Sequence, residues 1–123
     1  MLREIANVSQ REPGIKRRWF RDDYFDIFTW QTTAGQFANL QLCYDLGGHE
    51  RVLSWRSDGG YMHEAVDGGE QSPVRNRTPI LVADGVLPVD TVQREFDARC
   101  GALDAALQQF IRTRLAEYAS RAI

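Results

Sequence analysis

The stretch Lys16–Arg56, KRRWFRDDYFDIFTWQTTAGQFANLQLCYDLGGHERVLSWR, decides the fold class of this chain. Aromatic and β-branched residues recur in it between three turn signals, at Asp22-Asp23, at Thr32 to Gly35 and at Gly47-Gly48. This composition favours strands over helices. It predicts successive hairpins built from strands at 16–21, 24–31, 36–46 and 49–56.

The chain on either side first extends this pattern and then changes it. Residues 1–15 form an N-terminal segment in which we expect a short edge strand. Asp58-Gly59 predicts one more hairpin strand at 60–66, followed by a polar loop at 67–79 and a short strand at 80–84. Apolar residues then recur every third or fourth position over 90–119, which predicts helices. Asp90 or Thr91 can cap the first helix and Asp104 the second.

These elements predict an α+β fold, an antiparallel meander of five to six strands with C-terminal helices packed on one sheet face. The 123 residues fit a single domain, 1–123, that needs neither a metal nor a disulfide to fold.

The turns also predict a strand register. Tyr44 should oppose Arg51, and Leu42 should oppose Leu53. A four-residue loop at 32–35 would set Trp30 opposite Phe37. On this register the helix-facing side carries Phe25, Ile27, Leu40, Leu42, Leu53, Trp55 and Met62. Glu64 would also lie on that side and fits it badly, which indicates a sheet edge or a register slip near Tyr61.

The opposite sheet face is expected to mix aromatic rings with polar groups. Its residues are Arg17, Trp19, Asp26, Phe28, Trp30, Phe37, Asn39, Gln41, Cys43, Ser54, Arg56, Tyr61 and His63. Such a mixture is typical of a binding surface, where rings supply contact area and polar groups set orientation. Three interpretations stay open: half-buried packing under the chain's own loop, a homo-oligomer contact, and a site for a small ligand or substrate.

The catalytic candidates on this face are His63, Ser54 and Asp26. Ser54 and His63 would be cross-strand neighbours, close enough for a hydroxyl–imidazole hydrogen bond. Asp26 would lie three strands from His63, too far to orient its ring as a triad requires. The alternative to a binding module is therefore a small-molecule enzyme that uses His63 as its acid–base group, with Ser54, Gln41, Asp26 and Arg56 around the substrate.

Metal and nucleic-acid sites find less support. His49 and His63 would lie too far apart to share an ion, so we predict no metal and no cofactor. The formal net charge is −2, and Asp22, Asp23 and Asp26 follow the basic run that begins at Lys16. Both observations argue against nucleic acid as a partner.

An anion clamp is one further possibility. Arg75 and Arg77, in the polar loop, could join Arg17 and Arg56 around a carboxylate or phosphate if the loop folds over the face.

The compartment follows from cysteine usage and hydropathy. Cys43 and Cys100 are sparse, and the chain shows neither a signal peptide nor an apolar run of membrane-spanning length. We therefore expect free thiols, a cytoplasmic protein and no membrane partner.

Three segments carry a resemblance: RRWFRDDYFDIFTW at 17–30, FANLQLCYDLGGHERVLSWR at 37–56 and RTPILVADG at 77–85. They resemble a family of small uncharacterised bacterial proteins, a domain of unknown function, over most of residues 5–115. The resemblance implies a bacterial, stand-alone domain and transfers no catalytic residue. The leading hypothesis is a small bacterial binding or self-associating module, a homodimer for example, that uses the aromatic-polar face.

Overall fold

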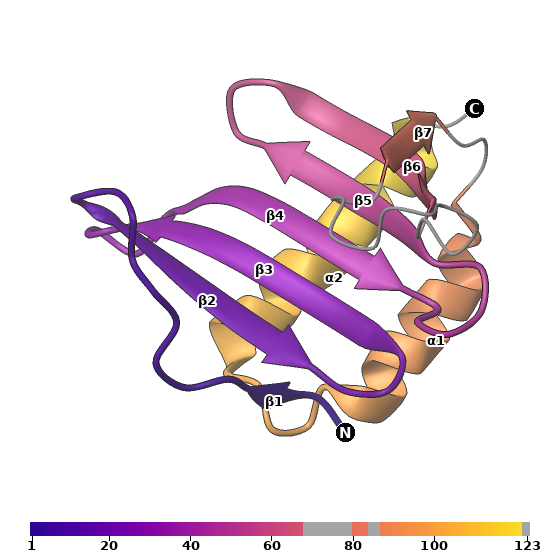
Figure 1. Ribbon diagram of the computed structural model, residues 1–123, viewed down its shortest axis with the longest axis horizontal. Coiled ribbons are helices and arrows are strands. Elements are labelled where there is room, and N and C mark those ends of the chain that lie inside the picture. Colours follow the sequence, from indigo (N-terminus) through magenta and orange to yellow (C-terminus); the bar gives the residue numbers. More distant parts are fainter. Residues whose placement is uncertain (68–79, 84–86, 122–123) are drawn as a thin grey trace, which may run out of the picture.

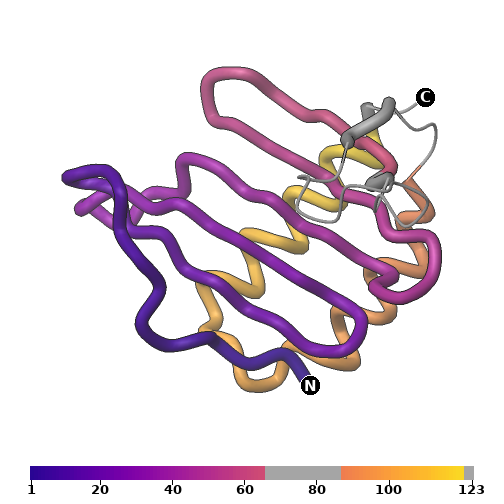
Figure 2. Tube along the Cα trace, viewed as in Figure 1, coloured from indigo at the N-terminus to yellow at the C-terminus, as the bar shows by residue number. Residues whose placement is uncertain are grey.

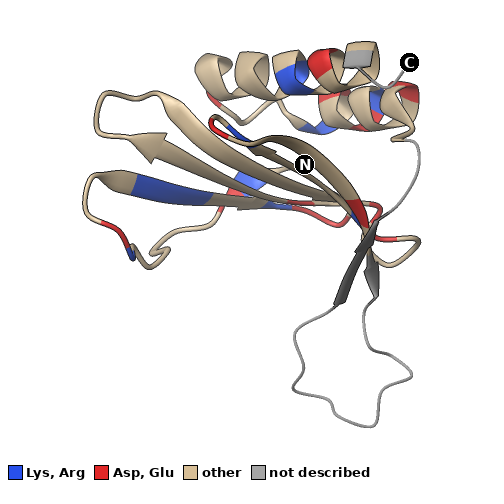
Figure 3. Ribbon diagram, turned by 90° about the horizontal axis from the view of Figure 1, so that it is seen from above, with Lys and Arg blue, Asp and Glu red and all other residues tan. Residues whose placement is uncertain are grey.

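The structure, a computed structural model, describes residues 1–67, 80–83 and 87–121. Its elements are β1 (Arg3–Glu4), β2 (Ile15–Arg21), β3 (Phe25–Thr32), β4 (Phe37–Tyr44), β5 (Arg51–Arg56), β6 (Gly60–Asp67), β7 (Ile80–Ala83), α1 (Val89–Arg99) and α2 (Ala105–Arg121). The strands form one antiparallel sheet in the order β1 to β7 (Figure 1), and Figure 2 traces the chain from each strand to its neighbour. Both helices lie on one side of this sheet (Figure 3).

The predicted α+β meander with C-terminal helices on one face is therefore confirmed. The edge strand expected in the N-terminal segment is β1, which pairs with β2. Of the predicted polar loop at 67–79, only the end of β6 lies within the described residues, so Arg75, Arg77 and the clamp built on them lie outside.

Asp104 caps α2 as predicted, because its Oδ2 accepts a hydrogen bond from Leu107 N at 3.2 Å. The cap predicted for α1 was wrong, because α1 begins at Val89 without a side-chain cap.

The β4–β5 register is the predicted one, whereas the β3–β4 register differs by two residues. Tyr44 opposes Arg51 and Leu42 opposes Leu53, but Ile27 pairs with Leu42 rather than with Leu40. One residue of the difference comes from the loop, which is closed by a 2.8 Å hydrogen bond from Thr32 N to Gln36 O and so is one residue shorter than predicted.

The other residue comes from a β-bulge that leaves Ala38 unpaired between Phe37 and Asn39. Because two shifts of one residue restore the original side, most of β4 faces as predicted. Phe37 lies between the loop and the bulge and experiences only the first shift. It therefore turns to the helix side, where its ring stacks on Phe110 at 3.9 Å.

The β5–β6 register differs from the prediction by one residue, which exchanges the two faces of β6. The turn leaves Arg56 opposite Gly60, whose φ is +80°, so the loop is one residue longer than the predicted two-residue turn. His63 opposes Leu53, and Ser54 opposes Met62. The predicted core position of Met62 was therefore wrong, and its side chain is 59% exposed.

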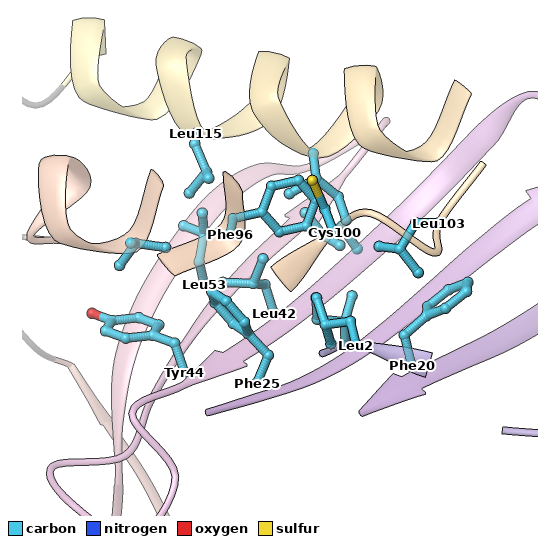
Figure 4. Packing of buried hydrophobic residues seen from close by; sticks show 14 of the residues in the cluster. Leu2, Phe20, Phe25, Leu42, Tyr44, Leu53, Phe96, Cys100, Leu103 and Leu115 are labelled. Atoms are coloured by element: carbon cyan, nitrogen blue, oxygen red, sulfur yellow. The ribbon is translucent and has the colours of Figure 1, made fainter. Parts of the chain in front are cut away.

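The core lies between the sheet and the helices (Figure 4). Phe25, Ile27, Leu40, Leu42 and Leu53 are buried there as predicted, and Trp55 packs against them half-buried. The opposing layer consists of Leu2, Leu87, Val92, Phe96, Cys100, Leu103, Leu107, Ile111 and Leu115. Among the described residues, no helix is long and apolar enough to cross a membrane.

Two ionic contacts join the helices to the edge of the sheet. Arg99, at the end of α1, lies 3.0 Å from Asp22 in the β2–β3 turn. Arg18 of β2 lies 3.0 Å from both Glu4 and Asp104, the cap of α2. These contacts hold the helix layer in one position against β2.

Candidate functional site

The candidate site is the open face, which we define as the strand residues that point away from the helices. Strand alternation assigns to it Arg17, Trp19, Arg21, Asp26, Phe28, Trp30, Asn39, Gln41, Cys43, Val52, Ser54, Arg56, Met62 and Glu64. The pairing arranges them in rows that cross the strands. The central row is Trp19, Phe28, Gln41, Ser54 and Met62.

Three rings on β2 and β3 form a ladder along one side of this face. Trp19 stacks on Phe28 with ring centroids 5.5 Å apart and planes 10° apart. Phe28 and Trp30 follow at 6.2 Å. All three rings are only partly buried. Rings of this kind supply large, stiff contact area, so the ladder is the main apolar feature of the open face.

Charged groups set the orientation of the ladder. The Trp19 indole N–H donates to Asp26 Oδ1, and the other oxygen of that carboxylate lies 3.3 Å from Arg21. The Arg17 guanidinium lies over Phe28, 6.0 Å from its centroid, close enough for a cation–π contact. Polar and charged groups thus hold the rings in place on this face.

The structure confirms most of the predicted face and corrects three positions. Arg17, Trp19, Asp26, Phe28, Trp30, Asn39, Gln41, Cys43, Ser54 and Arg56 lie on the open face as predicted. Phe37, Tyr61 and His63 lie on the helix side instead, because of the shorter β3–β4 loop and the longer β5–β6 loop. Sequence reasoning missed Arg21, Met62 and Glu64. The signal for the longer loop was Gly60, a second glycine directly after Asp58-Gly59.

His63 belongs to a buried cluster under α2. Its side chain is 6% exposed, and its Nε2 lies 2.7 Å from the Tyr44 hydroxyl. The Tyr118 ring of α2 lies 6.0 Å from the imidazole. Ser54 lies on the other side of the sheet, so the predicted Ser54–His63 pair is wrong. The arrangement that the enzyme hypothesis required around His63 is therefore not formed.

The described residues show neither an activated thiol at Cys43 nor a cluster of side chains that could bind a metal ion. Burial raises the pKa of the Cys43 thiol to about 12, with further contributions from Asp26 and Glu50. Cys43 therefore stays protonated near neutral pH and is a weak nucleophile. No group of three His, Cys, Asp or Glu side chains among the described residues could hold a metal ion.

Two depressions border the open face at its β2 edge. The larger, of about 420 Å³, is lined by Glu4, Ile5, Ala6, Asn7, Val8, Gln10, Arg17 and Arg18. The smaller, of about 210 Å³, is lined by Gln10, Arg11, Glu12, Ile15, Arg17 and Trp30. Arg17 and Gln10 line both, so this edge combines concave surface with a guanidinium and the partly buried ring of Trp30.

Comparison with known proteins assigns the chain to no family. Neither a protein-family model, a curated protein sequence nor a solved structure matches it.

Proposed function

We propose that this protein is a non-enzymatic binding module that associates with a second copy of itself through the open face. The observation that carries the proposal is the partly buried ladder of Trp19, Phe28 and Trp30, which shares its face with Met62, 59% exposed. Aromatic residues, Met and Arg are the types enriched at protein–protein contacts. Exposed apolar patches of this kind mark interaction sites.

A second copy fits this face because the rows of side chains are self-complementary. A two-fold axis parallel to β4 would set β3 against β5 of the second copy and β2 against β6. Trp19 would then meet Met62, a sulfur–aromatic contact, and Arg21 would meet Glu64, an ion pair. The ring of Trp30 would meet the guanidinium of Arg56. Each of these contacts occurs twice in the dimer.

The other simple two-fold arrangement is disfavoured by charge. An axis perpendicular to the strands would keep each strand opposite its own copy and reverse its direction. Arg17 of one copy would then face Arg21 of the other, which places like charges together. The axis parallel to β4 avoids this contact and sets Gln41 opposite Gln41, where two amides can exchange hydrogen bonds.

The proposal includes the compartment and the source of this module. Cys43 and Cys100 are both buried free cysteines, which supports a reducing compartment such as the cytoplasm. A bacterial source rests on the family resemblance.

The deciding measurement is the solution mass by light scattering over a wide range of protein concentration. We expect the mass of two chains for the wild type at high concentration and of one chain for Met62→Glu, because the new carboxylate would be buried against Trp19 of the second copy without a partner. Gln109→Glu, on the exposed surface of α2, is the matched control and should behave as the wild type. Circular dichroism checks that each variant is folded. A wild type that keeps the mass of one chain throughout, or a Met62→Glu variant that still dimerises, would overturn the proposal.

A further inference from the structure

Arg17 differs from the partly buried arginines that surround the core. Arg18, Arg99 and Arg114 each lie within 4 Å of a carboxylate. Arg17 is partly buried as well, yet no carboxylate of the described residues lies within ion-pair distance of it. Its Nη2 donates to Ser9 Oγ at 3.2 Å, and its Nε is buried without an acceptor. A buried donor without a partner is costly, and native proteins rarely leave one without a reason.

The backbone of Arg17 pairs with β3 on one side and is held on its outer edge by a side chain. The Gln10 side chain accepts from Arg17 N at 2.7 Å and donates to Arg17 O at 2.9 Å, so it imitates a β-ladder partner. The segment that carries Gln10 runs beside β2 before it turns back into that strand (Figure 2). Asn7 in this segment has a φ of +60° and lies at a bend of the chain. Arg17 is thus positioned at a fixed point between the two depressions.

The two depressions give the guanidinium access to a ligand. Arg17 lines both of them, and Trp30 lines the smaller one. A volume of about 210 Å³ lies below the range of about 300–1,000 Å³ that is typical of pockets for drug-sized ligands. An occupant of this smaller depression, where Arg17 and Trp30 meet, is therefore small. An arginine fork recognises carboxylate and phosphate groups in a bidentate manner, and the neighbouring ring offers a flat surface to a planar body.

We infer that Arg17 anchors a binding site for a small planar oxyanion, a ligand that bears a carboxylate or a phosphate, with Trp30 packed against its ring. The oxyanion balances the guanidinium charge, which no carboxylate of the described residues balances. Arg11 and Glu12 also line the smaller depression, and their opposite charges offset each other, so Arg17 supplies its net positive charge. Glu4 lines the larger depression and is paired with Arg18.

The test is a titration followed by the Nε–Hε resonance of Arg17 in NMR spectra, assigned by its loss in Arg17→Lys. The probes are benzoate, phenyl phosphate, inorganic phosphate and the neutral isostere benzamide. We expect benzoate or phenyl phosphate to shift the Arg17 resonance with saturation, and benzamide to leave it unchanged. The more tightly bound of the two anions assigns the ligand class to carboxylates or to phosphate esters.

Variants separate the anchor from its neighbours. In isothermal titration calorimetry, Arg17→Lys should weaken binding of the tighter anion by about tenfold or more, because an ammonium keeps the charge and loses the fork. Arg94→Lys, exposed on α1 and outside both depressions, should bind as the wild type. Trp30→Leu should weaken the ring-bearing anions and leave inorganic phosphate unchanged.

Three results would overturn the inference: no response of Arg17 to either ring-bearing anion, equal responses to benzoate and benzamide, or equal affinities for Arg17→Lys and the wild type. Light scattering on the same samples keeps the two proposals apart. A dimer that binds none of the anions contradicts only the oxyanion site. A monomer that binds them contradicts only self-association.

Discussion

The Tyr44 hydroxyl and His63 Nε2 lie 2.7 Å apart in the buried layer between the sheet and α2, and their rings are nearly parallel, with centroids 5.9 Å apart. This contact joins β4 to β6 across β5. It explains why a polar ring is accepted on the helix side, because a buried imidazole needs a hydrogen-bond partner.

Removal of that hydroxyl should therefore destabilise the fold. Tyr44→Phe leaves His63 without this partner in a buried position, which should lower the free energy of unfolding by about 1–3 kcal/mol. Urea denaturation followed by circular dichroism measures the change. The control is Tyr24→Phe, because the half-buried Tyr24 hydroxyl has no hydrogen-bond partner among the described residues. Equal losses in the two variants would show that the Tyr44–His63 contact contributes no stability of its own.

Thr29 should behave in the opposite way. Its side chain is fully buried on the helix side of β3, and its Oγ1 has no hydrogen-bond partner among the described residues. Thr29→Val replaces the unpaired hydroxyl by a methyl group of similar size and should raise the free energy of unfolding by about 1 kcal/mol. Thr29→Ser, which keeps the hydroxyl and loses the methyl, should lower it. A destabilised Thr29→Val variant would mean that the hydroxyl has a partner in solution.

Acid should weaken the fold partly through Asp22. Burial alone raises the pKa of this carboxyl, but hydrogen bonds from the amides of Phe25 and Tyr24 and from Arg99 outweigh it, and the pKa lies below the ordinary value. A depressed folded pKa means that the stabilisation is present above the unfolded aspartate pKa of about 3.9 and is lost as pH falls through the folded value.

Asp22→Asn keeps an acceptor for the turn and removes the titrating group. We expect it to be less stable than the wild type at neutral pH, with a smaller further loss as pH falls below about 4. Urea denaturation over a pH series measures both slopes. Asp58→Asn is the control, since the Asp58 side chain is 75% exposed and its variant should keep the wild-type slope. An unchanged slope in Asp22→Asn would place the acid sensitivity elsewhere, for example at Glu4 or Asp104, whose pKa values are also lowered by Arg18.

Charge reversal tests the two-fold arrangement directly. Arg21→Glu and Glu64→Arg should each raise the dimer dissociation constant by about tenfold or more, because each places like charges opposite one another. The double variant restores opposite charges and should recover most of the lost affinity. Sedimentation or light scattering at several concentrations measures all four proteins. Losses that add in the double variant, without recovery, would exclude a contact between Arg21 and Glu64 of the second copy.

The sequence predicted the architecture and much of the candidate site because both depend on local patterns. Alternation of residues and glycine-rich turns identify strands without knowledge of the partner strand. The Gly47-Gly48 turn was enough to predict that Leu42 opposes Leu53, and ten of the residues assigned to the open face lie there. The change of period after residue 90 separated the helices from the sheet.

Only the tertiary structure decided which side Phe37, Tyr61 and His63 occupy. A strand has a side-chain period of two, so a turn that is one residue longer or shorter exchanges the two faces of the strand. A difference of one residue in loop length leaves little trace in the local sequence pattern. Burial made the choice: Phe37 gains a stacked ring on α2, His63 gains Tyr44 as a partner, and Glu64 moves out of the core. These gains come from residues distant in the chain, and a local pattern cannot contain them.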